Sequence, residues 1–165
     1  MATKKLYDYY NGLPSWAKGV VVIGVGVAAW TVYTRITSTL KNKKSQKESK
    51  EVINSSNDEI TKLNKEGVRQ SYSDAQYKIW ADAAFSCYSG WGTCTGDTIF
   101  INMKNDVDVL KLIQAFGVRT IPSGMWNPAP DFTGSLPSVM RDELSGSDLS
   151  SINRLLAKKG IKYQF

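Results

Sequence analysis

Residue types that carry out covalent chemistry in proteins are sparse in this 165-residue chain. Histidine is absent, which excludes Ser-His and Cys-His catalysis and most metal-hydrolase mechanisms. The two cysteines, Cys87 and Cys94, would form a disulfide in an oxidising compartment and remain buried thiols in a reducing one. They are too few for a zinc site. Asp142 and Glu143 are an adjacent carboxylate pair, but neighbours on a helix point about 100° apart and would not face one glycosidic bond. We expect no enzymatic activity and no cofactor.

The strongest pattern in the chain is an apolar run near its start. Residues 13–33 read LPSWAKGVVVIGVGVAAWTVY and carry one charge, Lys18. As a helix this run would be roughly 30 Å long, which matches the hydrocarbon core of a bilayer. Trp16 and Tyr33 lie near its ends, where aromatic rings favour the membrane–water interface. The run predicts a single transmembrane helix over residues 13–35, preceded by a tail of residues 1–12.

Three other interpretations of this run are a cleaved signal peptide, a buried core helix and a shallow interfacial helix. The Thr-Arg-Ile-Thr sequence that follows has no small-residue cleavage site, and the run from Val20 to Ala29 has no polar face. We therefore favour a true span. Gly24 and Ala28 form a small-x-x-x-small pair, through which two such helices would pack closely in a homo-oligomer.

The formal net charge of +6 is unevenly distributed. Residues 71–165 contain equal numbers of basic and acidic side chains, so the excess lies in the first 70 residues. Basic residues follow the predicted span closely: Arg35, Lys41, Lys43, Lys44, Lys47 and Lys50. Cationic flanks remain on the cytoplasmic side, so the C-terminal part should lie on the cytoplasmic or interior side. We interpret these charges as a topology signal and a contact for anionic lipids rather than for nucleic acid.

The rest of the chain divides by composition. Residues 36–70 are polar and charged, with few apolar positions, and are interpreted as a solvated stalk that is at most partly helical. Residues 71–165 have enough apolar positions for one small core.

Helix signals within residues 71–165 predict five short helices. Expected starts are a capping box at Ser73, a start near Asp97, a cap at Asn105 or Asp106, a start at Ser135, and a cap at Ser145. Glycines at 90, 117 and 160 should end three of these helices. Three prolines between residues 119 and 134 predict an irregular loop there. Because no convincing strand alternation occurs, the predicted fold class is all-α.

Several junctions of this domain resemble those of one annexin repeat. They are a Gly-Trp-Gly-Thr turn at 90–93, Phe-Gly at 116–117, and Arg-Asp-Glu-Leu-Ser-Gly at 141–146. The ending GIKYQF and the opening YNGLPSWAKG are similar to those of single-span, annexin-like proteins of Bacteroidetes and their phages. The resemblance covers the predicted anchor and most of residues 71–165, but not residues 36–70.

The resemblance implies a calcium site, because the glycine turn of an annexin repeat supplies backbone carbonyls to calcium and a later carboxylate completes the shell. By position the ligands would be Tyr88, Gly90, Gly92 and Glu143. Two departures stand against it: Cys94, Thr95 and Gly96 follow where acidic residues are usual, and a proline-rich insertion lengthens the separation. A glycine turn that merely ends a helix is therefore the favoured interpretation.

Together these patterns predict a membrane-anchored structural or adaptor protein. The resemblance to the annexin-like proteins further implies a phage virion component that links a membrane to a protein assembly. Its expected partners are the lipid bilayer, other virion or envelope proteins, and copies of itself. Two other functions stay open: a bacterial envelope protein that binds calcium or cell-wall material, and a lytic accessory factor.

Overall fold

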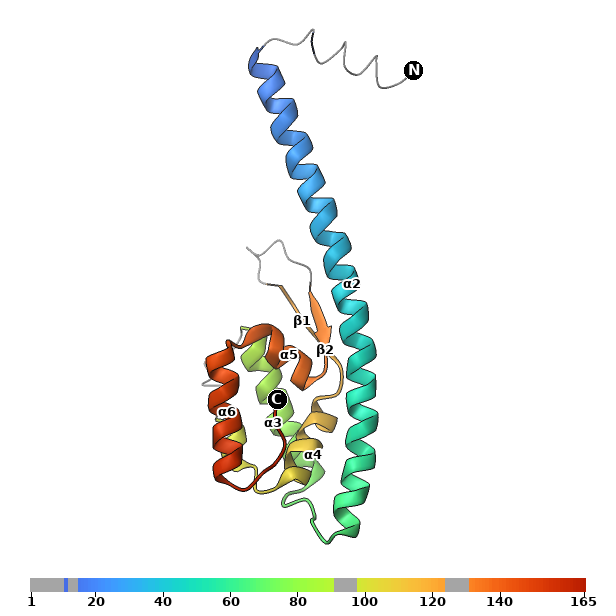
Figure 1. The fold of residues 1–165 in the computed structure, drawn as a ribbon, viewed down its shortest axis with the longest axis vertical. Coiled ribbons are helices and arrows are strands. Elements are labelled where there is room, and N and C mark those ends of the chain that lie inside the picture. The colour runs from blue at the N-terminus through green and yellow to red at the C-terminus, as the bar shows by residue number, and fades with distance from the viewer. Residues whose placement is uncertain (1–10, 12–14, 91–97, 124–130) are drawn as a thin grey trace. The chain divides into compact units, whose positions relative to one another are not determined.

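The computed structural model describes residues 11, 15–90, 98–123 and 131–165, with the backbone alone for 15–29, 31–32 and 34–36. The chain forms two compact units, residues 1–39 and 40–165. The described elements are α2 (Ser15–Lys65), α3 (Asp74–Tyr88), the 3-10 helix η1 (Phe100–Asn102), α4 (Asp106–Phe116), β1 (Arg119–Ile121), β2 (Phe132–Gly134), α5 (Leu136–Glu143) and α6 (Gly146–Lys158) (Figure 1). The fold is mostly helical, which confirms the predicted all-α class at that level.

Helix ends in residues 71–165 follow the signals in the sequence. The Ser73 side chain accepts a hydrogen bond from the backbone N–H of Gln76 at the start of α3. Asn105 caps α4 by accepting from Asp108 N–H, and Ser145 forms a capping box with Asp148 at the start of α6. Each cap satisfies N–H groups that have no partner within the helix. The predicted starts of these three helices are confirmed.

Two local predictions differ from the structure. The helix expected near residues 97–103 is only the short η1 among the described residues. The loop expected over 119–134 is framed by an antiparallel pair, in which β1 and β2 align Arg119 with Gly134 and Ile121 with Phe132. Strands of three residues are too short to show an alternating pattern, so they were not predictable from the sequence.

One hydrophobic core holds the C-terminal unit together. Helices α3 and α4 pack against each other, and α5 and α6 contribute buried side chains to the same cluster. Its fully buried large residues include Tyr77, Phe100, Met103, Leu112, Ile113, Leu136, Met140, Ile152 and Leu156.

The second half of α2 belongs to this unit, so the interpretation of residues 36–70 as a solvated, at most partly helical stalk is wrong. The chain is helical as far as Lys65, and residues 40–70 lie within the unit 40–165. Ser45, Ser49, Ser56 and Ile60 are buried in it. Figure 1 shows this part of α2 running beside the β1–β2 pair and α4.

Ile60 of α2 packs with Val107 and Leu110 of α4, whereas around residues 45–49 the contact of α2 with the rest of the unit is made by small side chains at close approach. The Oγ atom of Ser49 accepts a hydrogen bond from Ser135 N–H at 2.7 Å and lies 3.5 Å from the Ser138 hydroxyl. A Cβ added at Gly134 would lie 2.8 Å from the Oγ of Ser45. We call Ser45, Ser49, Gly134, Ser135 and Ser138 the serine seam. The serine seam has no signature in large apolar residues, because its close packing depends on side chains of small volume.

The residues predicted to contact the membrane are only partly described. Trp16, Gly24 and Ala28 fall where the backbone alone is described. Tyr33 is exposed, and its ring centroid lies 6.4 Å from that of Trp30. Among the residues whose side chains are described, no helix is long and apolar enough to be a candidate span.

Candidate functional site

The predicted glycine turn follows α3. Tyr88, the last residue of α3, is buried, and its hydroxyl has no hydrogen-bond partner among the described residues. Burial raises the pKa of Tyr88 to about 12. Gly90 has φ +74° and donates its N–H to the Cys87 carbonyl at 3.2 Å. That left-handed conformation suits glycine, so Gly90 acts here as a helix terminator. Gly92 lies in 91–97, outside the described residues.

Glu143 is the last residue of α5 and, unlike the preceding Asp142, forms no ion pair among the described residues. The Asp142 carboxylate forms an ion pair with Lys41 of α2. Desolvation raises the pKa of Glu143, and the charge of Asp142 raises it further, while Lys41 opposes both. In the described ranges, no group of three or more Asp, Glu, Cys or His side chains is placed to hold a metal ion. Calcium binding by Tyr88, Gly90, Gly92 and Glu143 stays a prediction.

Cys87 lies on α3, one residue before Tyr88, and is disulfide-bonded. Cys94, the other cysteine of the chain, lies in 91–97, outside the described residues. The predicted pairing of Cys87 with Cys94 therefore stays a prediction.

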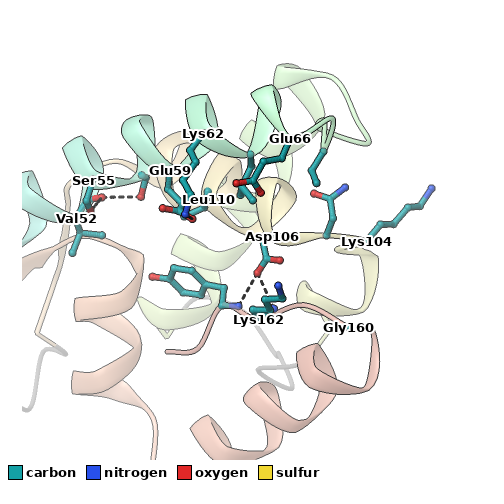
Figure 2. A pocket seen from close by; sticks show the side chains of 15 residues that line it. Val52, Ser55, Glu59, Lys62, Glu66, Lys104, Asp106, Leu110, Gly160 and Lys162 are labelled. Carbon is teal, nitrogen blue, oxygen red and sulfur yellow. Dashed lines mark hydrogen bonds and ion pairs between the residues drawn. The ribbon is translucent and has the colours of Figure 1, made fainter.

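The C-terminal unit contains a groove of about 740 Å³ that the sequence analysis does not predict. It runs between the second half of α2 on one side and the start of α4 with the C-terminal residues on the other (Figure 2). Its walls are formed by Val52, Ser55, Ser56, Glu59, Lys62, Leu63, Glu66, Val68, Lys104, Asn105, Asp106, Leu110, Gly160, Lys162 and Tyr163. We call this the α2–α4 groove.

The α2–α4 groove has an apolar floor and charges of both signs at its rim. Leu110 is buried, and Val52, Leu63 and Tyr163 are half-buried around it. Glu59 projects from α2 and Glu66 from the turn that follows it, while Lys104 and Lys162 belong to the opposite wall (Figure 2). An apolar floor within a charged rim is typical of a surface that binds a protein segment.

The wall opposite α2 is held in place by Asp106. Its Oδ1 atom accepts hydrogen bonds from the backbone N–H groups of Lys162 and Tyr163, at 2.8 and 2.7 Å (Figure 2). These bonds fix the C-terminal residues against the first turn of α4. Burial raises the pKa of Tyr163, and the positive charge of Arg141 opposes that effect.

The start of α4 is fixed from behind by a fully buried carboxylate, Asp108. Its Oδ1 atom accepts from Ser71 N–H at 2.7 Å and from the Tyr77 hydroxyl at 2.5 Å. Its Oδ2 atom accepts from Lys104 N–H at 2.9 Å. Burial, and then the hydrogen bond to Asp108, raise the pKa of Tyr77 above its ordinary value. Asp108 therefore joins the 66–72 turn, α3 and α4 into one scaffold behind the groove.

The comparisons with known proteins give no relative to extend this picture. No protein-family model matches the chain, and neither a curated protein nor a solved structure matches it.

Proposed function

We propose that the chain is a membrane-anchored, non-enzymatic adaptor that binds a partner protein through its C-terminal unit, residues 40–165. The observation that carries the proposal is the apolar run of residues 13–33 followed by a basic segment. The backbone is helical from Ser15 onward, which is the conformation that a segment needs to cross lipid. The basic segment favours a cytoplasmic or interior location for the C-terminal unit.

The α2–α4 groove supports the adaptor part of the proposal. Its floor offers apolar area, and Glu59 and Lys162 on opposite walls offer charges of opposite sign. The proposed occupant is a segment of another protein of the same assembly, with an apolar anchor flanked by a basic and an acidic side chain. Charges on the rim would set the direction in which that segment lies.

The assembly we propose is a virion that contains a membrane, on the strength of the resemblance carried by the 90–93, 116–117 and 141–146 segments. The test is to purify native particles on a density gradient, with and without detergent, and to quantify this chain by mass spectrometry. We expect a fixed copy number per particle that is lost when detergent removes lipid. Recovery only in host envelope fractions would overturn the virion assignment and favour the envelope protein that binds calcium or cell-wall material.

The docking step has its own test. Photo-crosslinkers placed at Leu63 and Val68 in the groove should capture one protein of the particle, whereas a crosslinker at exposed Arg154 on α6 should not. Equal capture from both faces would contradict docking in the groove.

A further inference from the structure

A second hollow, of about 350 Å³, lies where the first residues of the C-terminal unit meet α5. Its lining comes from α2, β2 and α5: Lys41, Lys44, Ser45, Glu48, Phe132, Ser138, Arg141 and Asp142. Of these lining residues, only Lys41 and Lys44 are among the basic residues predicted to lie near lipid, because Arg141 is about one hundred residues away along the chain. We call this the α2–α5 hollow.

The charges around the α2–α5 hollow leave cationic groups available. Lys41 is paired with Asp142, and its ammonium also lies 5.3 Å from the ring centroid of Phe132. The Lys44–Glu48 pair is exposed and 3.8 Å apart, a geometry that contributes little in water. Arg141 donates its Nε–H to the Pro137 carbonyl at 3.2 Å and forms no ion pair with a carboxylate of the described residues. Its other guanidinium N–H groups have no hydrogen-bond acceptor among the described residues, so they can donate to an anion.

Ser45 adds a neutral donor to the same hollow. The residue is 7% exposed, and its hydroxyl is buried without a hydrogen-bond partner among the described residues. A buried polar group left without a partner costs about 1–3 kcal/mol, so a ligand oxygen that reaches it would recover part of that cost. Guanidinium, ammonium and hydroxyl donors around one hollow are the groups that bind phosphate oxygens.

We propose that the α2–α5 hollow binds the phosphate of an anionic phospholipid headgroup, with Arg141 and Lys44 as the charged donors and Ser45 below them. The choice of a lipid as the source of the phosphate rests on the proposed function, because the basic residues of the hollow follow the predicted span within a few positions. Lys43 and Lys47, which are exposed on α2 beside the hollow, would add attraction to a negatively charged leaflet.

The test uses the full chain in micelles of an uncharged detergent, so that it does not depend on whether residues 13–35 cross a bilayer. Short-chain phosphatidylglycerol, short-chain phosphatidylcholine and inorganic phosphate are titrated separately, and binding is measured by calorimetry. We expect saturable binding of phosphatidylglycerol, with phosphatidylcholine and inorganic phosphate much weaker. Inorganic phosphate binding as tightly as phosphatidylglycerol would overturn the lipid as the source, and no binding of any of them would overturn the site.

Variants locate the binding within the unit. Arg141→Gln should lower the phosphatidylglycerol affinity about tenfold, as expected for the loss of one charge-assisted hydrogen bond. The matched control is Arg154→Gln, which removes the same charge from an exposed position on α6 and should leave the affinity unchanged. Equal losses in the two variants would show attraction to net charge alone and would overturn the site.

Ser45→Ala tests the neutral donor separately. It removes a hydroxyl that has no hydrogen-bond partner among the described residues, so the melting temperature should not fall. The affinity for phosphatidylglycerol should nevertheless fall several-fold. An unchanged affinity in this variant would exclude Ser45 from the site. A failure of this lipid test leaves the gradient experiment able to succeed, so that the two proposals can fail separately.

Discussion

Removing the Asp108 carboxylate should destabilise the C-terminal unit more than any surface substitution. Asp108→Ala leaves three buried or half-buried donors without their acceptor: Ser71 N–H, the Tyr77 hydroxyl and Lys104 N–H. A hydrogen bond to a charged group contributes about 1.5–3 kcal/mol. The sum overstates the loss, because Ala also avoids the cost of burying a charge. We expect the free energy of unfolding to fall by about 3–4 kcal/mol.

The Asn variant separates hydrogen bonding from volume. In Asp108→Asn the amide oxygen can replace Oδ1, which accepts from Ser71 and Tyr77, but the amide NH₂ then faces Lys104 N–H as one donor against another. A loss of about 2 kcal/mol is expected, which lies between the wild-type and Ala values. Tyr77→Phe removes only one of the three donors and should cost less than Asp108→Ala.

The assay is urea unfolding of the full chain in uncharged detergent, followed by near-ultraviolet circular dichroism. A shift of the midpoint at constant m-value reports a change in stability. Asp58→Ala is the matched control, because Asp58 is exposed on α2 and forms no ion pair among the described residues. A loss below about 1 kcal/mol for Asp108→Ala, or a loss equal to that of Asp58→Ala, would refute the role of Asp108.

Three further predictions concern other parts of the chain. Gly134→Ala should lower the unfolding free energy by about 1–3 kcal/mol in the same urea assay. The new Cβ would lie 2.8 Å from the Ser45 hydroxyl oxygen and 2.9 Å from the Ser138 Cβ. Adding Ser45→Ala to this variant should recover part of the lost stability. Burial raises the pKa of Tyr88 to about 12, so the unfolded chain releases this proton first, from about pH 10. The free energy of unfolding should therefore fall as the pH rises above about 10. Tyr88→Phe should reduce that fall in thermal melts taken across this pH range. Val25→Lys places a charge in the middle of the apolar run at a cost of about 2.5–3.5 kcal/mol for insertion, so the protein should become extractable from membranes by alkaline carbonate, while extraction unchanged from wild type would contradict the span.

Helix caps were predictable because they depend on a few residues that are close in sequence. Ser73, Asn105 and Ser145 each accept a hydrogen bond from an N–H group three positions later, so the signal is present in any short window of the chain. The left-handed glycines Gly117 and Gly160 are local in the same way. Nothing distant in the chain is needed to interpret them.

The packing of α2 was not predictable from the same rules. A packing face is usually marked by large apolar residues at helical spacing, and residues 41–70 contain few of them. The structure buries Ser45 and Ser49 as well as Ile60, and the two serines fit because the facing chain at Gly134 and Ser135 comes so close that only small side chains have room. That proximity depends on a partner segment about ninety residues later, so no local pattern records it.

The two hollows were missed for a related reason. Each combines residues of α2 with residues far along the chain: Glu59 with Lys162 in the α2–α4 groove, and Lys44 with Arg141 in the α2–α5 hollow. Charged residues on a helix usually indicate a solvated face, so no local pattern pairs Glu59 with Lys162 or Lys44 with Arg141. A covarying pair of positions would have been the signal to look for.

The serine seam has a consequence for how this unit opens. Between Asn42 and Ser49, α2 is held mainly by polar contacts: Asn42 bonds with Thr133 N–H and the Asp131 carbonyl, and Ser49 bonds with Ser135 N–H. Water replaces such bonds at a net cost of about 0.5–1.5 kcal/mol each, and small side chains expose little apolar area when they separate. This stretch of α2 should therefore detach and rejoin many times during the lifetime of the folded core, with amide hydrogens that exchange sooner than those of α4. Detachment there would free the part of α2 that follows the predicted span while the core of α3, α4, α5 and α6 stays intact.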